Sequence, residues 1–264
     1  MGEETAGRNR LRSNLFRLEF EDLTQAGLVD RIGEAIRARE RCWIVTVNVN
    51  LLCLAHRDPS FRQVVERAEI RTADGMPIVW MSRLRGRPLT ARVTGADLMV
   101  PLATRAAQEG WRLFLCGGAP GVADRAAAEL LRRAPGVNVV GTASPSFADL
   151  AELTDPDANA GLLGAIRAAA PDVLLVAFGA PKQERWIDAH RTSGALVVPV
   201  AIGVGGSFDF LVGQQSRAPG WMQRGGLEWI HRALTQPGRL GPRYARDALT
   251  FARLCVQELF APRR

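Results

Sequence analysis

The sequence predicts an α/β fold: a Rossmann-like, mostly parallel sheet with helices on both faces, followed by an Arg-rich helical C-terminal appendage. The sheet is predicted by short, nearly continuous apolar runs that alternate with longer segments of helical period. Such runs are typical of parallel strands covered on both faces. The appendage is predicted because this alternation stops after residue 216, where arginine begins to dominate the charged residues. We therefore expect a domain over 1–216 and an appendage over 217–264.

The elements follow one another along the chain. The run CWIVTVNVN (42–50) predicts a strand that leaves into a loop, and the next segment predicts a helix that begins near Pro59. Ligands of such folds bind at the carboxyl ends of the strands, so chemistry is expected in the loops there. Further helices are expected over 96–110, 121–134, 159–170 and 181–191, and further strands over 111–118, 137–143, 172–179 and 195–205.

Composition narrows the class of protein. The chain is 47% hydrophobic and 23% charged, as expected for a globular domain with a substantial core. Its longest apolar stretches run to only about 8–12 residues, whereas a membrane-spanning helix needs roughly 20. The N-terminus has no apolar segment of the secretory kind. Four cysteines without a CxxC pair favour a reducing cytoplasm and argue against disulfides or structural zinc.

Charge is concentrated at the C-terminal end. After residue 216 there are nine arginines and three acids, which accounts for six of the net +7 charges of the chain. An excess of this kind indicates a phosphate group, a membrane surface or nucleic acid as the partner. The tail lacks the interleaved aromatic and basic residues of an RNA-binding platform, so nucleic acid is not expected.

Two glycine- or proline-containing motifs lead from a strand into a helix. CGGAPG, with Gly117 and Gly118, is suited to a phosphate at a helix N-terminus, and equally to a tight strand–helix turn. FGAPKQERW places Gln183 and Glu184 in a first helical turn. These two residues are candidate ligands, although a plain helix start, with Glu184 complementing the helix dipole, explains the pattern too.

The motif GVGGSFDF ends the last predicted strand. It supplies Gly205 and Gly206, and it places Asp209 between two phenylalanines. An acid in that setting is either a specificity residue or a buried structural partner. Both interpretations stay open from the sequence.

A further group of loops surrounds the first strands. Thr46 and Asn48 lie at a spacing of two, on one side of a strand end. In RVTGADL, the residues Arg92, Gly95 and Asp97 form a helix entry, where Asp97 is either a ligand or a helix cap.

Asp74, in ADGMPIVW, raises the sharpest question. Asp-Gly is a common turn dipeptide, so the plain interpretation is a turn residue, and the alternative is a catalytic base.

Several other chemistries are disfavoured. The three histidines are isolated, GxSxG and GxxxxGK[ST] motifs are absent, and the pair Asp155–Asp157 precedes a helix in the manner of a cap. No metal and no cofactor are therefore expected.

Ten motifs taken in order resemble the WecG/TagA/CpsF glycosyltransferases of bacterial surface polysaccharide synthesis. They are TVNVNLLCLA, ADGMPIVW, RVTGADL, FLCGG, FGAPKQE, GVGGSFDFLVG, RAPGW, GLEWIHR, QPGR and RY, and the resemblance runs in order from about residue 42 to 252. The resemblance implies inverting, metal-independent transfer of a sugar, N-acetylmannosamine in the best-known members, from a UDP-sugar to a polyprenyl-diphosphate-linked sugar. It implies a Rossmann-like domain with an appendage that completes the site and reaches the membrane.

The same resemblance assigns roles to residues. Asp74 corresponds to the proposed base, and Thr46, Asn48 and Gln183 correspond to positions that line its pocket. Leaving UDP accumulates negative charge that must be balanced if no metal does so. Arginines of the appendage are the candidates for this, with Arg217, Arg224 and Arg232 first.

The tail has a second expected role. Its apolar residues from Leu249 to Phe260, together with its arginines, suit a helix at the inner face of the cell membrane, as in a peripheral cytoplasmic enzyme. The alternative is that its apolar stripe packs on the main domain or on a neighbouring subunit of a homo-oligomer.

Two rival functions remain in view. A NAD(P)-dependent oxidoreductase predicts a GxGxxG turn and a ribose-binding acid, which the sequence does not supply cleanly. A non-enzymatic module that binds membrane or nucleic acid predicts binding without turnover of any UDP-sugar.

Overall fold

The computed structural model describes residues 12–220, 222, 228, 231 and 237–261, and of 237–245 the backbone only. Its centre is a six-stranded sheet in which every pairing is parallel. The strands are β3 (Cys42–Val47), β4 (Ile70–Ala73), β5 (Arg112–Gly117), β6 (Asn138–Ala143), β7 (Val173–Ala177) and β8 (Val200–Gly203). Their order across the sheet is β4-β3-β8-β7-β5-β6. The predicted fold class is confirmed.

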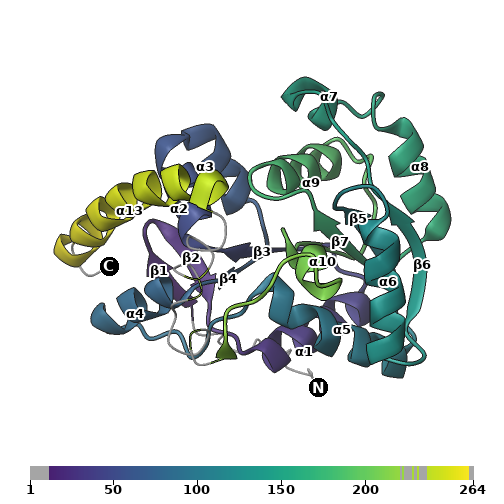
Figure 1. Ribbon diagram of the computed structural model, residues 1–264, viewed down its shortest axis with the longest axis horizontal. Helices are drawn as coiled ribbons and strands as arrows, with labels where there is room; N and C mark the ends of the chain where they lie inside the picture. The colour runs from purple at the N-terminus through teal and green to yellow at the C-terminus, as the bar shows by residue number, and fades with distance from the viewer. Residues whose placement is uncertain (1–11, 221, 223–227, 229–230, 232–236, 262–264) are drawn as a thin grey trace, which may run out of the picture.

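Strand side chains alternate between two cores because successive residues of a strand point to opposite faces. In β3, Trp43, Val45 and Val47 belong to one core cluster, and Cys42 and Ile44 belong to the other. The second cluster is covered by α1 (Gln25–Ala38), α5 (Gly95–Glu109), α6 (Val122–Arg133) and α10 (Ser207–Leu211). The first is covered by α2 (Val49–Arg57), α3 (Pro59–Glu66), α4 (Met76–Leu84), α7 (Leu150–Thr154), α8 (Ala160–Ala169) and α9 (Lys182–Thr192). Figure 1 shows the sheet between these helices.

The predicted strands and helices are present, with one correction. The strand expected over 42–50 ends at Val47, because Asn48 caps a helix that the sequence analysis did not predict, α2. The side-chain oxygen of Asn48 accepts a hydrogen bond from the Leu51 amide at 3.0 Å. An N-terminal antiparallel hairpin, β1 (Arg12–Leu15) and β2 (Leu18–Glu21), also went unpredicted, as did the edge strand β4 and the helices α1, α4, α7 and α10.

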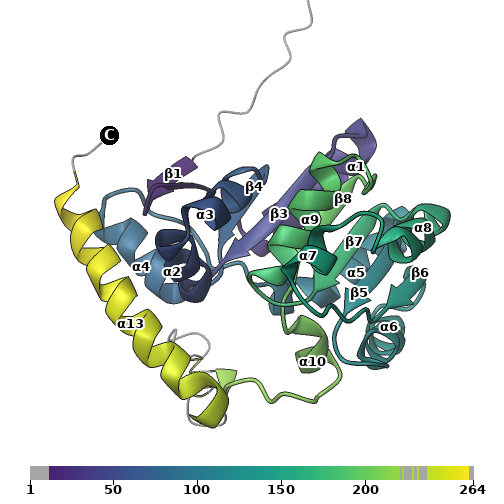
Figure 2. The same cartoon turned by 90° about the horizontal axis from the view of Figure 1, so that it is seen from above.

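The described part of the appendage is the helix α13 (Pro237–Phe260). It lies on the side of the molecule that carries α2 and α4, far from α6 and β6 (Figure 2). Its Asp247 accepts a hydrogen bond from Arg57 of α2 at 2.5 Å, and its Glu258 lies 3.6 Å from Arg85, just after α4. Leu254 is buried in the first core cluster. The expectation that the tail packs on the main domain is therefore met on this face of the helix.

The opposite face of α13 is apolar and exposed. Leu249, Val256 and Phe260 have exposed fractions of 68%, 54% and 85%. With the exposed Arg253 they follow at spacings of four, three and four residues, so they share one helix face. Within the described chain, no helix combines the length and apolarity needed to cross a membrane.

Candidate active site

The carboxyl ends of the parallel strands meet at one edge of the sheet, which we call the carboxyl edge. The strand order places the loops after β4, β3, β8, β7 and β5 side by side along it. Apart from Arg92, Gly95, Asp97 and Arg217, the predicted site residues within the described chain lie in these loops, in the strand ends that lead to them or in the first turns of the helices that follow. Arg92, Gly95 and Asp97 lie in the connection between α4 and α5 and in the first turn of α5. The sheet topology thus brings together motifs that are far apart in the sequence.

Asp74 is the first residue after β4. Its amide donates to the carbonyl oxygen of Val47, at the end of the neighbouring β3, at 2.8 Å. The carbonyl oxygen of Ala73 accepts from the amide of Val93 at 2.9 Å. Gly75, with φ +154°, then turns the chain into α4. Asp74 is therefore fixed between β3 and the loop that carries Arg92, and its side chain is half-buried.

Thr46 and Asn48 lie at the end of β3, beside Asp74. Thr46 is a buried strand residue, whereas Asn48 is half-buried and caps α2. The cap uses the Asn48 side-chain oxygen. The structure thus brings the two residues to the predicted place, and it gives Asn48 a structural task there.

Gly117 and Gly118 end β5 in backbone conformations that favour glycine, with φ +122° and +78°. A Cβ atom on Gly117 would lie 2.6 Å from the carbonyl carbon of Ala177 in β7, closer than real contacts allow. The Gly118 amide donates to the Ala177 carbonyl oxygen at 3.2 Å. These contacts support the tight strand–helix turn, the plainer of the two interpretations of CGGAPG.

Gln183 joins two loops of the carboxyl edge. Its Oε1 accepts from the Gly179 amide at 3.1 Å and from the Gly205 amide at 2.9 Å. Its Nε2 donates to Glu184 Oε1 at 2.8 Å. The side chain is 5% exposed, so its amide ties the loop after β7 to the loop after β8.

Glu184 lies beneath Gln183 and is 1% exposed. Its Oε2 has no hydrogen-bond partner among the described residues. Because burial penalises the charged form, the pKa of Glu184 is raised to about 7, against the opposing effect of the Gln183 hydrogen bond. The buried carboxyl group of Glu184 is linked to the loops of the carboxyl edge through its hydrogen bond with Gln183.

The loop after β8 packs on the entry to α5. A Cβ atom on Gly95 would lie 3.0 Å from the Val204 Cα, so glycine lets the two loops approach closely. A Cβ atom on Gly205, with φ +54°, would meet no heavy atom within 4 Å, and one on Gly206 would lie 3.9 Å from Asp209 Oδ2. Asp209 accepts from Gln215 Nε2 at 2.8 Å, an interaction that shapes the turn leading to the appendage.

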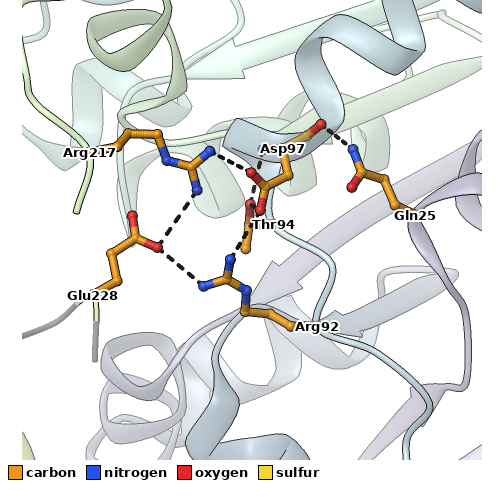
Figure 3. Close-up of polar contacts among 6 residues, drawn as sticks. All are labelled: Gln25, Arg92, Thr94, Asp97, Arg217 and Glu228. Carbon is orange, nitrogen blue, oxygen red and sulfur yellow. Dashed lines mark hydrogen bonds and ion pairs between the residues drawn. The ribbon is translucent and has the colours of Figure 1, made fainter. Parts of the chain in front are cut away.

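Arg92 and Asp97 meet the appendage residue Arg217 in a network that also contains Glu228, and we call these four residues the salt-bridge ring (Figure 3). Arg217 Nη1 donates to Asp97 Oδ1. Arg92 donates to Asp97 Oδ2 and to Glu228 Oε2, both at 3.2 Å. Arg217 Nη2 lies 3.7 Å from Glu228 Oε2. Each guanidinium therefore contacts both carboxylates.

The ring is partly shielded from water, since its four side chains are 15–27% exposed. Burial raises the pKa of Asp97, but the hydrogen bonds and charges of Arg217, Thr94 and Arg92 outweigh it and hold that pKa below its usual range. The pKa of Arg217 is raised because Asp97 and Glu228 outweigh its own desolvation. Asp97 and Arg217 are thus held in their charged forms around neutral pH.

Thr94 and Gln25 fix Asp97 from behind. The Thr94 hydroxyl accepts from the Asp97 amide at 3.0 Å, which caps α5, and donates to Asp97 Oδ2 at 2.9 Å. Gln25 Nε2 donates to the Asp97 carbonyl oxygen. The sequence analysis did not name Thr94, although a threonine three residues before an acid at a helix start is a recognised capping pattern.

Glu228 was also missed, because one acid in an Arg-rich segment carries no signal of its own. Two predicted residues, Arg224 and Arg232, lie outside the described residues, so their roles stay predictions. The substrate contacts predicted for the other residues also stay predictions.

Two surface hollows lie away from the carboxyl edge. One, of about 380 Å³, is lined by residues that include Trp43 and Glu69, at the amino ends of β3 and β4. The other, of about 500 Å³, is lined by α6 and the edge strand β6. In the part of the chain that the structure describes, no three His, Cys, Asp or Glu side chains come together as metal ligands would. The strand ends, rather than the hollows, hold the predicted chemistry.

Comparison with known proteins gives one family and one relative that cover most of the chain. The glycosyl transferase WecG/TagA/CpsF family matches residues 13–264. A protein of Bacillus spizizenii named N-acetylglucosaminyldiphosphoundecaprenol N-acetyl-beta-D-mannosaminyltransferase is 32% identical over 223 residues, which cover 84% of this chain and 82% of the relative.

Proposed function

The chain belongs to the WecG/TagA/CpsF glycosyltransferase family, and we propose that it moves N-acetylmannosamine from a UDP-sugar to a polyprenyl-diphosphate-linked sugar, with inversion and without a metal. The name of the Bacillus spizizenii relative supports this donor sugar and this class of acceptor. The observation that carries the proposal within the molecule is Asp74. This carboxylate stands at the carboxyl edge, held by backbone hydrogen bonds between two strands and the Arg92 loop.

The reaction needs one base. As the acceptor hydroxyl oxygen forms its bond to the anomeric carbon, Asp74 takes the proton of that hydroxyl group. The bond between the anomeric carbon and the diphosphate oxygen breaks, and UDP leaves with the electron pair. Attack from the side opposite to the leaving group inverts the anomeric centre. Thr46 and Asn48, beside Asp74 on the neighbouring strand, are proposed to contact the sugar.

Leaving UDP carries charge that the protein must balance. Arg92 and Arg217 are the proposed partners of the diphosphate, with Arg224 and Arg232 as further candidates. Fixed cations placed where charge develops lower the barrier without reorganisation. A guanidinium pair could therefore take the part that a metal ion plays in other transferases, which supports metal independence.

The exposed face of α13 is the proposed contact with the inner leaflet of the cell membrane. Leu249, Val256 and Phe260 would enter the boundary between headgroups and acyl chains, while Arg253 would meet anionic lipid. The opposite face of the helix binds the main domain through Asp247 and Glu258. The helix would thus bring the carboxyl edge to a lipid-linked acceptor.

The first experiment measures UDP release from a panel of UDP-sugars, with and without a polyprenyl-diphosphate-linked N-acetylglucosamine, in EDTA throughout. We expect acceptor-dependent release with UDP-N-acetylmannosamine, and a loss of at least about a hundredfold in Asp74→Asn, the size typical of a lost general base. Asp188→Asn is the matched control, because Asp188 pairs with Arg67 in the hollow at the amino ends of the strands.

The results separate the parts of this proposal. Release that stops in EDTA would contradict metal independence. Full activity in Asp74→Asn would make Asp74 a turn residue. No release with any donor would overturn the transferase proposal for these substrates.

A second experiment tests the membrane contact with sedimenting vesicles that contain anionic lipid. A triple variant with serine at 249, 256 and 260 is expected to lose at least tenfold in binding. Leu131→Ser is the control, because Leu131 is an exposed apolar residue on α6, away from α13. Unchanged vesicle binding together with loss of an oligomer would instead assign the stripe to a subunit interface.

A further inference from the structure

Asp97 and Glu228, the two carboxylates of the salt-bridge ring, have no role in the proposed transfer reaction, although both contact the arginines proposed to hold the leaving group. Arg92 reaches Asp97 and Glu228 at the same distance of 3.2 Å. Arg217 reaches the same two acids from the other side (Figure 3). The acids therefore stand between two like charges that would otherwise repel each other.

The ring is attached to the backbone that fixes the base. Val93, the next residue after Arg92, donates its amide to Ala73, the residue before Asp74. On the other side, Gly95 packs on the backbone of Val204, after β8. The side chains of the ring are thus tied to the same loops as the proposed base, and Arg217 is held there from the appendage.

We propose that Asp97 and Glu228 are positioning residues that hold the guanidiniums of Arg92 and Arg217 side by side as a preformed receptor for a diphosphate. The proposal rests on the proposed function and deepens it, because it names the group that this part of the site receives. Two diphosphates enter the reaction, that of the UDP-sugar and that of the lipid carrier. Both diphosphates would bind a pair of guanidiniums in the same way, so the experiment must show which of the two this part of the site receives.

The physical reason for such a device is the length of arginine. A free arginine side chain has up to about 2 kcal/mol of rotamer entropy to lose when it binds. A diphosphate needs two cations held at a fixed separation. Carboxylates that bridge both guanidiniums order them before the ligand arrives, so less is lost on binding and in the transition state.

A positioning role for Glu228 predicts that removing its charge changes the affinity for a diphosphate in the direction opposite to that expected from charge repulsion alone. If Glu228 were only a nearby negative charge, Glu228→Gln would bind a diphosphate more tightly, because a repulsive charge is removed. If Glu228 positions the arginines, the same change loosens them and weakens binding. The direction of the change in affinity therefore separates the two roles.

The experiment compares Glu228→Gln with Glu258→Gln in the full chain. Glu258 is the matched control, because it too is an appendage glutamate paired with an arginine of the main domain, Arg85, at similarly low exposure. Calorimetry measures the Kd for UDP and, separately, for a short prenyl diphosphate. UDP release measures kcat and KM, and thermal melting confirms the fold.

In Glu228→Gln we expect the Kd for one of these diphosphates to rise at least threefold and kcat to fall at least tenfold, while Glu258→Gln stays within twofold of the wild type. The diphosphate whose Kd rises identifies the source. Glu228→Asp, which keeps the charge, should recover part of the loss. Should Glu228→Gln lose the fold, Glu228→Asp supplies the same comparison with smaller expected changes.

Three results would overturn the proposal: a lower or unchanged Kd in Glu228→Gln, equal losses in both glutamine variants, or no diphosphate binding by the wild type. Failure of the transferase proposal looks different. The wild type would then bind UDP with the predicted variant pattern and yet transfer no sugar.

Discussion

The two ends of the same sheet use the same residue types in different ways. At the amino ends of the strands, Arg67 binds Asp188 through two hydrogen bonds of 2.6 Å, and Arg191 binds Glu69 at 2.9 and 3.1 Å. Each acid there has one arginine. At the carboxyl edge, the two acids of the salt-bridge ring are shared between two arginines, and one of these comes from the appendage.

Exposure separates the two ends further. Each pair at the amino ends joins an exposed member to a buried one: Arg67 is 50% exposed and Asp188 12%, while Glu69 is 43% exposed and Arg191 13%. All four members of the ring are 15–27% exposed. A hollow at the amino ends is therefore lined by pairs whose charges are already matched one to one. The carboxyl edge gathers glycine loops, helix N-termini and charges that are shared rather than matched one to one. The comparison teaches that the same residue types form closed pairs at one end of a parallel sheet and a shared network at the end where ligands of such folds bind.

The largest expected effect sharpens this contrast within one strand. Gly110 precedes β5 and Gly117 ends it, and both have positive φ. Gly117→Ala places a Cβ atom 2.6 Å from the Ala177 backbone, so we expect a loss of about 4 kcal/mol or more in the free energy of unfolding. Gly110→Ala meets no atom within 4 Å and should cost only about 1 kcal/mol. Urea unfolding of both variants measures this, and equal losses would contradict the close approach at the carboxyl edge.

The second effect compares two acids of α9, Glu184 and Asp188. Glutamate in the unfolded chain ionises near pH 4.5 and Glu184 in the folded chain near pH 7, so the folded state holds an extra proton between these values. Stability due to Glu184 therefore falls as pH rises from about 4.5 to 7 and is level above that. Glu184→Gln cannot ionise, so its stability relative to wild type should rise by about 3 kcal/mol across this window.

Unfolding free energies of wild type and Glu184→Gln, measured from pH 4.5 to 8, test this directly. The difference between the two proteins isolates Glu184 from all other titrating groups. Asp188→Asn serves as the control, because Asp188 lies on the same helix but, unlike Glu184, is paired with an arginine, Arg67, through two hydrogen bonds of 2.6 Å. A flat difference for Glu184→Gln would mean that the carboxyl group is not buried as described.

The smallest effect compares Asp97→Asn with Asp188→Asn. Asp97 serves two arginines in a partly buried setting, so its loss should cost about 2 kcal/mol of stability. Asp188 is 12% exposed but serves one arginine, which is itself half-exposed and can turn to water, so its loss should cost less, about 1 kcal/mol. The cost at Asp188 should shrink further in 1 M salt, because salt screens exposed pairs more strongly. Equal costs in chemical denaturation would remove the distinction between the two ends.

The centre of the fold could be predicted because the inner strands β3, β5, β7 and β8 are buried on both faces and therefore form continuous apolar runs. The edge strand β4 has only four residues, one of them an arginine, and was not predicted. α2 could not be predicted, since TVNVN has the alternation of a strand and only the cap at Asn48 reveals the helix. The hairpin β1–β2 and α4 are short, and such elements carry too few residues for a clear period.

The candidate site was predictable to the extent that it follows strand ends. Motif order predicted the family, which the comparison confirms. The ring shows what local sequence cannot give. Glu228 meets its two arginine partners only through tertiary packing. Asp97 uses one oxygen for the nearby Arg92 and the other for Arg217, which is 120 residues further along the chain. Whether each predicted residue touches substrate stays a prediction.

The pairing of β3 with β8 has a consequence for how the protein is made. Cys42 pairs with Val200, so β3, the first strand of the sheet to be synthesised, gains its second neighbouring strand only after β8, the last strand, has been made. Until then its unpaired backbone and that of β7 are open to other chains, and such long-range parallel pairing forms slowly. The loops that carry Asp74 and Gly205 come to lie along the same edge of one sheet when β8 pairs with β3. A nascent chain that ends before β8 therefore lacks both the complete sheet and the complete carboxyl edge. We expect chains that stall on the ribosome in this stretch to be bound by chaperones.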